Sequence, residues 1–322
     1  MATFKTSILI TGGTQGMGYQ TALALARQCP QTLIVMAARS DPNNTAATIN
    51  KKLNQSNARF LSLDLGSMAK VRDFVQRWNT GGYPPIQALV LNAGIQLPGD
   101  IEYTEDGIEK QFAVNHVGHA LLFHLLVPNL TSDARIVVVS SGVHDPSMKW
   151  GMDPFYTTAE KVAHPSPEAI KQSDGKGRYS TSKVANALWT VALGRHLSSL
   201  PAHREKTVVA LDPGLMYPTH LTRDAPAMYK FLSQHVLHRC IPLLRVAMNP
   251  NINNPTESGG NLAWLTVGKE VKGKKGVYYE KRKEHAVSKQ AQDEKLQEDL
   301  WKWTIDTVAN GVEERERFAR VE

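Results

Sequence analysis

The chain has 322 residues, of which 42% are hydrophobic and 21% charged, so it can form a sizeable core and global disorder is excluded. The formal net charge of +7 at pH 7 indicates an anionic partner, but the basic residues are spread along the chain, which favours a phosphate-bearing cofactor over nucleic acid. Cys29 and Cys240 lie far apart without metal-ligand spacing, so we expect neither a disulfide framework nor a metal site.

No stretch approaches the ~20 apolar residues of a spanning helix, and the first predicted strand begins almost at once, with no basic stretch leading into a long apolar run. We therefore expect a soluble, cytoplasmic protein without a transmembrane segment.

Six short β-rich runs recur along the chain, with helical patterns between them. They are nearly continuous in apolar residues, as expected when helices cover both faces of a parallel sheet. The runs are residues 7–11, 32–37, 59–64, 88–91, 135–140 and 207–211. Strand then helix, repeated, predicts a doubly wound α/β fold, with one parallel Rossmann sheet in a single domain over residues 1–322.

A glycine-rich turn follows the first strand, and a helical pattern continues from it to residue 28. Glycine lets the backbone turn sharply and approach a pyrophosphate, while the helix N-terminus presents free N–H groups and a partial positive charge. This strand, turn and helix context predicts a dinucleotide site. Its expected contacts are Gly12, Thr14, Gln15, Gly16, Met17 and Gly18.

The end of the second strand predicts which dinucleotide is bound. NAD-selective sites place an acidic residue there for the ribose hydroxyls, whereas this chain has Ala38 followed by Arg39 and Ser40. Without a carboxylate, a 2′-phosphate is not repelled, and Arg39 offers a planar charged fork for it, so NADPH is favoured over NADH. The alternative is that Arg39 is a surface residue and Asp41 binds a ribose.

Two further strand ends complete the predicted cofactor site. Asp64 and Leu65 follow the third strand, where an adenine can rest with its amino group on the carboxylate; alternatively, Asp64 caps the helix that begins near Ser67. After the fourth strand, the small-residue bend Asn92-Ala93-Gly94 allows the cofactor to come close to the backbone.

The reacting groups are predicted in Tyr179-Ser-Thr-Ser-Lys183, at the start of a helix that continues to about residue 196. Positions i and i+4 share a helix face, so the phenol and the ammonium project into one pocket. A nearby lysine, together with an oxidised nicotinamide, lowers the phenol pKa toward neutral pH and makes Tyr179 an acid or a base. The alternative is a pair of surface residues on a helix.

Two more polar positions extend this pocket. Ser140-Ser141 ends the fifth strand at the edge where the glycine turn lies, so a hydroxyl there can hold the substrate oxygen beside Tyr179. Asn115 stands in an otherwise apolar helical run, where its amide needs partners, and a water chain through Lys183 is one.

Several segments fall outside the strand and helix rhythm. Two insertions follow strand ends, at residues 144–177 and 217–254, and we expect them to form the walls of the substrate site. Within the second insertion, the apolar run 231–248 is predicted as a packed helix. The alternatives for this run are a lid and a membrane-surface contact. The lysine-rich stretch 269–283 is predicted as a solvated loop, and residues 288–312 as one amphipathic helix. Histidines of the insertions, among them His144, are predicted as exposed loop residues.

These motifs, in this order over residues 7–220, resemble the short-chain dehydrogenase/reductase superfamily. The resemblance implies a tetrad in which Ser141, at the family's second serine position, polarises the carbonyl and Tyr179 donates the proton. Lys183 holds the nicotinamide ribose and lowers the phenol pKa, while Asn115 positions a relay water. It also implies cofactor contacts from Tyr179, Lys183, Pro213, Gly214 and Thr219.

The long spacing from Ser141 to Tyr179, and Leu188-Trp189 after the lysine, are closest to the retinol dehydrogenase and protochlorophyllide reductase-like branch. We expect an NADPH-dependent reductase or dehydrogenase for a bulky apolar ketone or aldehyde, such as a secondary metabolite. A dinucleotide sensor and a non-redox enzyme such as a cyclase or epimerase are the alternatives. The helices over residues 104–130 and from Tyr179 resemble the family's dimer interface, so a homodimer or homotetramer is expected unless the C-terminal extension covers that surface.

Overall fold

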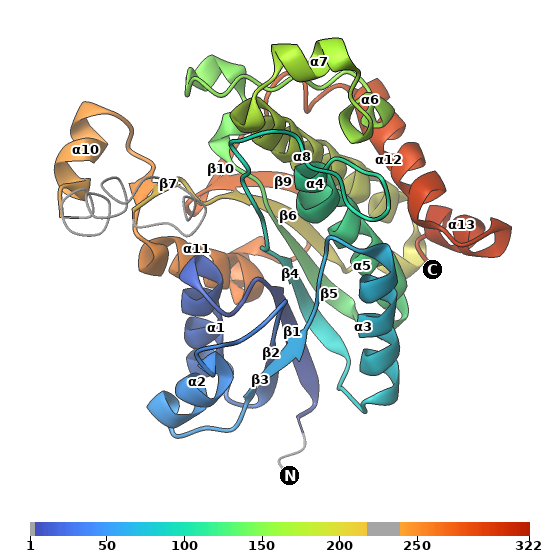
Figure 1. Cartoon of the computed structure of the whole chain (residues 1–322). Helices are drawn as coiled ribbons and strands as arrows, with labels where there is room; N and C mark the ends of the chain where they lie inside the picture. Colours follow the sequence, from blue (N-terminus) through green and yellow to red (C-terminus); the bar gives the residue numbers. More distant parts are fainter. Residues whose placement is uncertain (1–3, 218–238) are drawn as a thin grey trace.

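A computed structural model describes residues 4–217 and 239–322. Its centre is an eight-stranded sheet in the order β10-β9-β6-β5-β4-β1-β2-β3, parallel except for β10, with helices on both faces (Figure 1). The strands are β1 (Thr6–Thr11), β2 (Thr32–Ala38), β3 (Ala58–Ser62), β4 (Ile86–Leu91), β5 (Leu130–Val139), β6 (Thr207–Asp212), β9 (Lys275–Glu280) and β10 (Lys283–His285). The predicted doubly wound Rossmann sheet is therefore confirmed, and its six predicted strands are present.

The helices of the described residues cover both faces of this sheet or, like α10, lie apart from it (Figure 1). They are α1 (Gly16–Gln28), α2 (Thr45–Leu53), α3 (Met68–Thr80), α4 (Lys110–Phe112), α5 (Gly118–Leu126), α6 (Ala159–Ala163), α7 (Pro167–Gln172), α8 (Gly175–Ser199), α10 (Ile241–Ala247), α11 (Pro255–Val267), α12 (Glu294–Val308) and α13 (Val312–Ala319). A separate two-stranded pair joins β7 (Leu215–Met216) to β8 (Ile252–Asn253).

Strand residues alternate between two apolar cores. In β1, Ile8 and Ile10 pack with α1, α2 and α11, whereas Leu9 packs with α3, α5 and α8 on the opposite face. Successive side chains of a strand point to opposite faces, so a run that is apolar throughout buries both of its faces. The strands therefore show no alternation of polar and apolar residues. Because helices cover both faces of the sheet, a site can form only where the strands end.

The C-terminal part of the sheet differs from the sequence prediction. Residues 269–283 are not a solvated loop, because β9 pairs in parallel with β6 and β10 continues the sheet beyond it. Lysine stems can cover apolar surface while the ammonium reaches water, so a lysine-rich run is compatible with a strand. Tyr278 and Tyr279 supply the buried part of β9.

Three helix predictions are also corrected. The helical run at 104–130 begins only at Lys110 and contains a π-helical turn, Ala113–Val117, between α4 and α5. The helix of Tyr179 begins earlier, at Gly175, because Asp174 caps its N-terminus by accepting a hydrogen bond from the Gly177 N–H. The C-terminal tail forms two helices, α12 and α13, which are separated at Gly311 with a φ of 86°.

The described parts of the insertions follow the carboxyl ends of β5 and β6 along the chain. Residues 231–238 of the predicted packed helix lie outside the described residues. In the part that follows, α10 buries Ile241 but exposes 68% of Leu243 and 88% of Val246, so this segment is not a core helix. Figure 1 shows α10 extending away from the body of the molecule.

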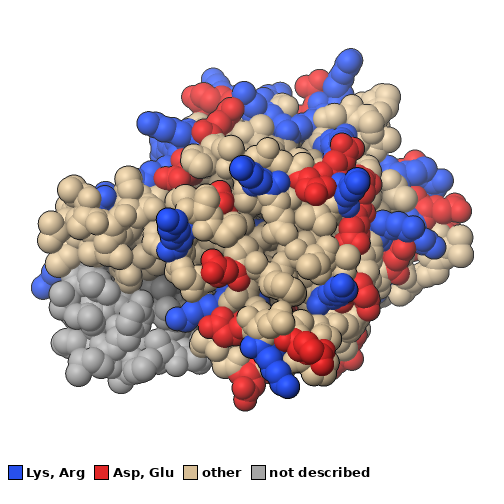
Figure 2. Space-filling view, turned by 90° about the horizontal axis from the view of Figure 1, so that it is seen from above, with Lys and Arg blue, Asp and Glu red and all other residues tan. Residues whose placement is uncertain are grey.

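Over residues 4–217 and 239–322, the structure contains no helix that combines the length and hydropathy needed to cross a bilayer. Acidic and basic side chains are interspersed over the face seen in Figure 2, so the net charge does not gather into one basic patch there.

Candidate active site

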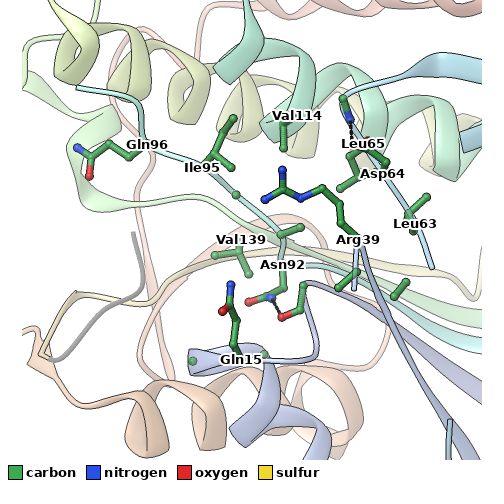
Figure 3. Close-up of a pocket in the computed structure, with 18 of the residues that line it drawn as sticks. Gln15, Arg39, Leu63, Asp64, Leu65, Asn92, Ile95, Gln96, Val114 and Val139 are labelled. Atoms are coloured by element: carbon green, nitrogen blue, oxygen red, sulfur yellow. Dashed lines mark hydrogen bonds between the residues drawn. The ribbon is translucent and has the colours of Figure 1, made fainter. Parts of the chain in front are cut away.

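A cavity of about 490 Å³ opens at the carboxyl ends of β1, β2, β4 and β5. It joins most of the residues predicted from separate motifs. The predicted residues that line it are Gly12, Thr14, Gln15, Gly16, Met17, Gly18, Arg39, Asp64, Leu65, Asn92, Ala93, Gly94, Tyr179, Lys183 and Pro213. Figure 3 shows Gln15 and Arg39 reaching into this cavity, with Ile95 and Val114 on its wall.

The glycine turn has the geometry that the sequence predicts. Gly12 and Gly16 adopt φ values of 67° and 54°, in the region where only glycine is free of strain. A Cβ on Gly18 would lie 2.2 Å from the Gly12 carbonyl oxygen, so helix α1 can begin this close to the turn only because position 18 is glycine.

The N-terminus of α1 is open to a ligand. Gln15 is its N-cap residue, but its side chain makes no capping hydrogen bond, and the first turn contains no acidic residue. The first N–H groups of a helix lack intrahelical partners and attract an anion. The turn and the uncapped helix therefore fit a pyrophosphate group of a dinucleotide.

Arg39 is exposed at the end of β2 and lines the cavity, where Figure 3 shows its guanidinium. Ser40 is also exposed, but it is not among the cavity-lining residues, and its carbonyl accepts a hydrogen bond from the Thr14 hydroxyl at 3.4 Å. The Asp41 carboxylate binds the start of α2, where it accepts hydrogen bonds from the Thr45 N–H at 2.9 Å and from the Thr45 hydroxyl at 2.7 Å. The alternative in which Asp41 binds a ribose is therefore not favoured.

The part of the cavity wall that is predicted to bind adenine contains an ion pair. Asp64 lies 3.1 Å from the Lys70 ammonium. Burial acts to raise the pKa of Asp64, but hydrogen bonds from Lys70 and from the Gly66 N–H outweigh it and lower that pKa. Ser67, not Asp64, caps helix α3, so the carboxylate remains at the cavity wall.

Asn92 and Ala93 are tied to the first strand through Thr11. The Thr11 hydroxyl accepts hydrogen bonds from the N–H groups of Asn92 and Ala93 at 2.9 and 3.0 Å. The Asn92 amide donates to the Thr11 carbonyl at 2.7 Å. A Cβ on Gly94 would lie 3.4 Å from the Asn115 Oδ1 and 3.6 Å from the Lys183 Nζ, so this bend brings the backbone close to two predicted catalytic residues.

Tyr179 and Lys183 lie one helical turn apart on α8 and both line the cavity, as their spacing predicts. Both are buried, at 7% and 3% exposure. The Lys183 ammonium lies 5.6 Å from the centroid of the Tyr179 ring and donates a hydrogen bond to the Val139 carbonyl at 3.0 Å. They are therefore not a surface pair.

In the protein without a bound cofactor, burial shifts the pKa values of both residues. Burial first, and the Asp212 carboxylate second, raise the pKa of the Tyr179 phenol. Burial also lowers the pKa of Lys183 to about 8. The protein's own groups therefore favour the protonated phenol, which is the form that donates a proton.

Ser140 and Ser141 have different surroundings. Ser140 is buried, lines the cavity and donates its hydroxyl to the Lys183 carbonyl at 2.9 Å. Ser141 is half-buried and does not belong to the cavity lining; its hydroxyl accepts only a long hydrogen bond, at 3.5 Å, from the Val143 N–H among the contacts described. The assignment of the substrate-polarising hydroxyl to Ser141 remains a prediction.

Asn115 lies in the π-helical turn and is fully buried. Its Oδ1 accepts a hydrogen bond from the Ile95 N–H at 2.8 Å, and its Nδ2 donates to the Ile95 carbonyl at 3.0 Å and to the Ser182 hydroxyl at 2.9 Å. The amide therefore has the hydrogen-bond partners that its buried position requires. These partners are Ile95, in the loop after β4, and Ser182, on α8, so Asn115 joins that loop to that helix. Its relay water stays a prediction.

The loop after β6 holds the last predicted contacts. Pro213 lines the cavity, and Gly214 adopts a φ of 75° but is not in the lining. Thr219 lies outside the described residues. Asp212, at the end of β6, is a buried carboxylate that the sequence analysis missed; its Oδ1 accepts a hydrogen bond from the Gly214 N–H at 2.9 Å and its Oδ2 one from the Asn251 amide at 3.0 Å.

Other cavity residues were also missed by the sequence analysis. Lys70 lies inside a helix, and Ile95, Val114 and Val139 are apolar residues without a motif. Lys70 had one usable signal, since it lies six positions after Asp64, near the start of the following helix. The apolar residues carried no such signal because nearly every strand and helix here contains similar ones.

The fold and the site define a dinucleotide-binding α/β protein with a paired tyrosine and lysine in its cavity. The family profile described as short chain dehydrogenase matches residues 6–164, and that of the AcuH dehydrogenase domain matches residues 219–316. The chain belongs to the short-chain dehydrogenase/reductase superfamily, in its retinol dehydrogenase-like branch.

Two curated relatives illustrate this membership. The chain is 31% identical to polyprenol dehydrogenase of Danio rerio over 93% of its own length and 86% of the relative. It is 31% identical to human retinol dehydrogenase 14 over 92% of its own length and 84% of the relative. The predicted branch is thereby confirmed.

Solved structures share the fold. An uncharacterized protein of Mycobacterium paratuberculosis superposes with a TM-score of 0.68 at 22% identity, covering 95% of this chain and 94% of that one. A blue fluorescent protein from a metagenomic library, in complex with NADPH, superposes with a TM-score of 0.59 at 19% identity, covering 87% of this chain and 97% of that one. Both superpositions show that the chain shares its fold with these proteins.

Proposed function

We propose that the protein is an NADPH-dependent oxidoreductase that reduces a ketone or aldehyde of a bulky apolar small molecule, such as a secondary metabolite, or oxidises the matching alcohol. The observation that carries the proposal is that Tyr179 and Lys183 line the same cavity as the glycine turn. Relatives named for polyprenol and retinol support a large apolar alcohol or carbonyl as the substrate.

The proposed roles follow from the positions of the side chains. When bound, the reduced nicotinamide supplies a hydride to the carbonyl carbon. Tyr179, held protonated by burial, donates its proton to the carbonyl oxygen. Lys183, one turn away on α8, binds the nicotinamide ribose and stabilises the phenolate that forms. In this proposal Ser141 orients the carbonyl and Asn115 holds the relay water.

The preference for NADPH rests on Arg39. It is exposed at the cavity, no acidic residue ends β2, and Asp41 is engaged with α2. A guanidinium pairs with a phosphate through two parallel hydrogen bonds, whereas ribose hydroxyls gain much less from it. We therefore propose that Arg39 binds the 2′-phosphate, with Lys70 as a second cation at the same wall.

The first experiment measures binding of NADPH and NADH to wild type and to Arg39→Ala. We expect Arg39→Ala to weaken NADPH binding by at least tenfold while NADH binding changes less than twofold, because loss of a charge-assisted pair costs about 1.5–3 kcal/mol. Lys5→Ala, a change on the N-terminal side of β1 and outside the cavity lining, serves as the control. Equal affinity of wild type for both nucleotides would exclude the assignment of NADPH.

The second experiment follows NADPH oxidation with a panel of polyprenyl, retinoid and polycyclic aldehydes and ketones. Tyr179→Phe keeps the buried ring but removes the proton donor, so we expect a loss of turnover of at least a hundredfold with NADPH affinity within twofold. Tight NADPH binding without Tyr179-dependent turnover of any carbonyl would support the sensor or the non-redox alternative. The cytoplasmic location also stays a proposal, which cell fractionation tests.

A further inference from the structure

We infer that His144 is a positioning residue for Ser141, and that it connects the loop after β5 to the C-terminal segment around Ser288. The inference rests on the proposed function, because it assumes that Ser141 orients the substrate. His144 was predicted as an exposed loop histidine, but it is only 2% exposed. A buried imidazole in a loop beside the site requires an explanation of its hydrogen bonds.

The contacts of His144 determine its protonation state. Its Nε2 lies 3.0 Å from the Ser288 backbone N–H, which can only donate, so Nε2 is the acceptor. Its Nδ1 lies 2.8 Å from the Ser141 carbonyl oxygen, which can only accept, so Nδ1 carries the proton. Burial lowers the pKa of His144, which keeps the ring neutral. The neutral Nδ1–H tautomer is thus the form that satisfies both neighbours.

These bonds act directly on the backbone of Ser141. Its carbonyl accepts from the His144 ring and also from the His144 backbone N–H at 3.1 Å. The other end of the same peptide unit is held as well, because the Gly142 N–H donates a hydrogen bond to Asp212, and a Cβ on Gly142 would lie 2.8 Å from the Asp212 Oδ2. The peptide unit that joins Ser141 to Gly142 is therefore held at both its carbonyl and its N–H, whereas the Ser141 hydroxyl has, among the contacts of the described residues, one long hydrogen bond at 3.5 Å.

The C-terminal part of the chain provides the support behind this loop. The Tyr278 ring on β9 packs against the His144 ring with centroids 4.9 Å apart, and its hydroxyl lies 3.4 Å from Nδ1. Ser288 follows β10, and its own hydroxyl accepts from the Ala291 N–H at 3.2 Å, which fixes the turn that presents the Ser288 N–H. Residues more than 130 positions away in the sequence thus hold the Ser141 loop.

The variant His144→Phe tests this inference, since it keeps a ring of similar size but removes both hydrogen bonds. We expect kcat for the carbonyl to fall at least tenfold, because Ser141 is misplaced in this variant. NADPH affinity should stay within twofold, because the glycine turn that is predicted to bind the nucleotide is unchanged. His203→Phe is the matched control: His203 is also buried, and it also bonds a backbone carbonyl, Val321 O at 2.9 Å, outside the cavity lining. We expect His203→Phe to lose stability and keep kcat.

Hydrogen–deuterium exchange supplies a readout that needs no turnover. Peptides spanning residues 140–148 should exchange faster in His144→Phe than in wild type and His203→Phe. A second variant, Tyr278→Phe, keeps the ring contact and should lower kcat by only a fewfold. Unchanged exchange in His144→Phe, or a kcat loss equalled by His203→Phe, would overturn the inference. If wild type itself has no Tyr179-dependent turnover, the proposed function fails, and the exchange result still decides whether His144 fixes the loop.

Discussion

Lys183 is a buried lysine whose positive charge opposes folding. It is 3% exposed, and burial lowers its pKa to about 8 from the ordinary value of 10.5. Its ammonium has one described hydrogen bond, to the Val139 carbonyl, which also accepts from the Asn186 amide at 3.1 Å. The folded protein therefore solvates this ammonium less well than water does, and removal of Lys183 would leave no unpaired carbonyl.

We predict that Lys183→Met abolishes turnover but raises the stability of the ligand-free protein at pH 7 by about 1 to 3 kcal/mol. Between pH 8 and 10.5, folded Lys183 has lost its proton while unfolded Lys183 keeps it. The unfolded state then binds more protons, so wild-type stability rises with pH through this window and the advantage of Lys183→Met disappears. Urea unfolding from pH 7 to pH 10.5 measures both trends.

The control for this prediction is an exposed lysine. Lys171→Met removes a charge from the surface of α7, so its stability difference from wild type should not vary with pH. If Lys183→Met is less stable than wild type at pH 7, the ammonium is solvated better than its burial indicates, and its hydrogen bond stabilises the fold.

At the scale of elements, the contact between α8 and β9 depends on two glycines. A Cβ on Gly194 of α8 would lie 2.4 Å from the Gly276 backbone nitrogen and 2.7 Å from its Cα. These are backbone atoms of β9, which is paired with β6, so they cannot move aside as a flexible side chain can. Gly276 itself has a φ of 71°. The helix that carries Tyr179 and Lys183 therefore approaches the sheet at a distance that only glycine permits.

We predict that Gly194→Ala lowers the free energy of unfolding by about 1 to 3 kcal/mol, because overpacking outweighs the gain in helix propensity. Gly260→Ala is the matched control within α11, where a Cβ meets nothing within 4 Å, and we expect it to raise stability by ~0.5–1 kcal/mol. Thermal unfolding of both variants measures the difference. A Gly194→Ala variant as stable as Gly260→Ala would show that α8 and β9 separate easily.

Local patterns explain which parts of this molecule the sequence predicted. The glycine turn, Tyr179 with Lys183 and the six apolar strands are encoded within a few neighbouring residues, and the structure places them as expected. Strand β9 was missed because the lysines around it resemble a solvated loop, and its pairing with β6 is specified by residues far away. His144 and Asp212 were missed for the same reason, since their burial depends on segments that only the fold brings together.

At the scale of the whole molecule, the C-terminal helices cover the face formed by α5 and α8, as Figure 1 shows. His116 bonds the Thr304 hydroxyl at 3.0 Å, and His124 stacks on Phe318 with ring centroids 4.8 Å apart. His196 of α8 stacks on Trp301 at 4.2 Å. These are the two helices that the sequence suggested as a dimer interface, and their apolar contacts are made within the chain.

We predict that the protein is a monomer with the mass of one chain, 35.6 kDa. Two chains cannot pair through α5 and α8 unless α12 and α13 leave, and their departure would expose the buried side chains of Leu300, Ile305 and Phe318. Exposing a large apolar side chain costs about 1.5–3 kcal/mol. Exposing all three side chains would therefore cost more free energy than a typical contact in a dimer interface provides. Light scattering after size-exclusion chromatography, from 1 to about 100 μM as the range where weak dimers form, measures the mass. A stable dimer whose mass persists on dilution would show that the chain associates through another face.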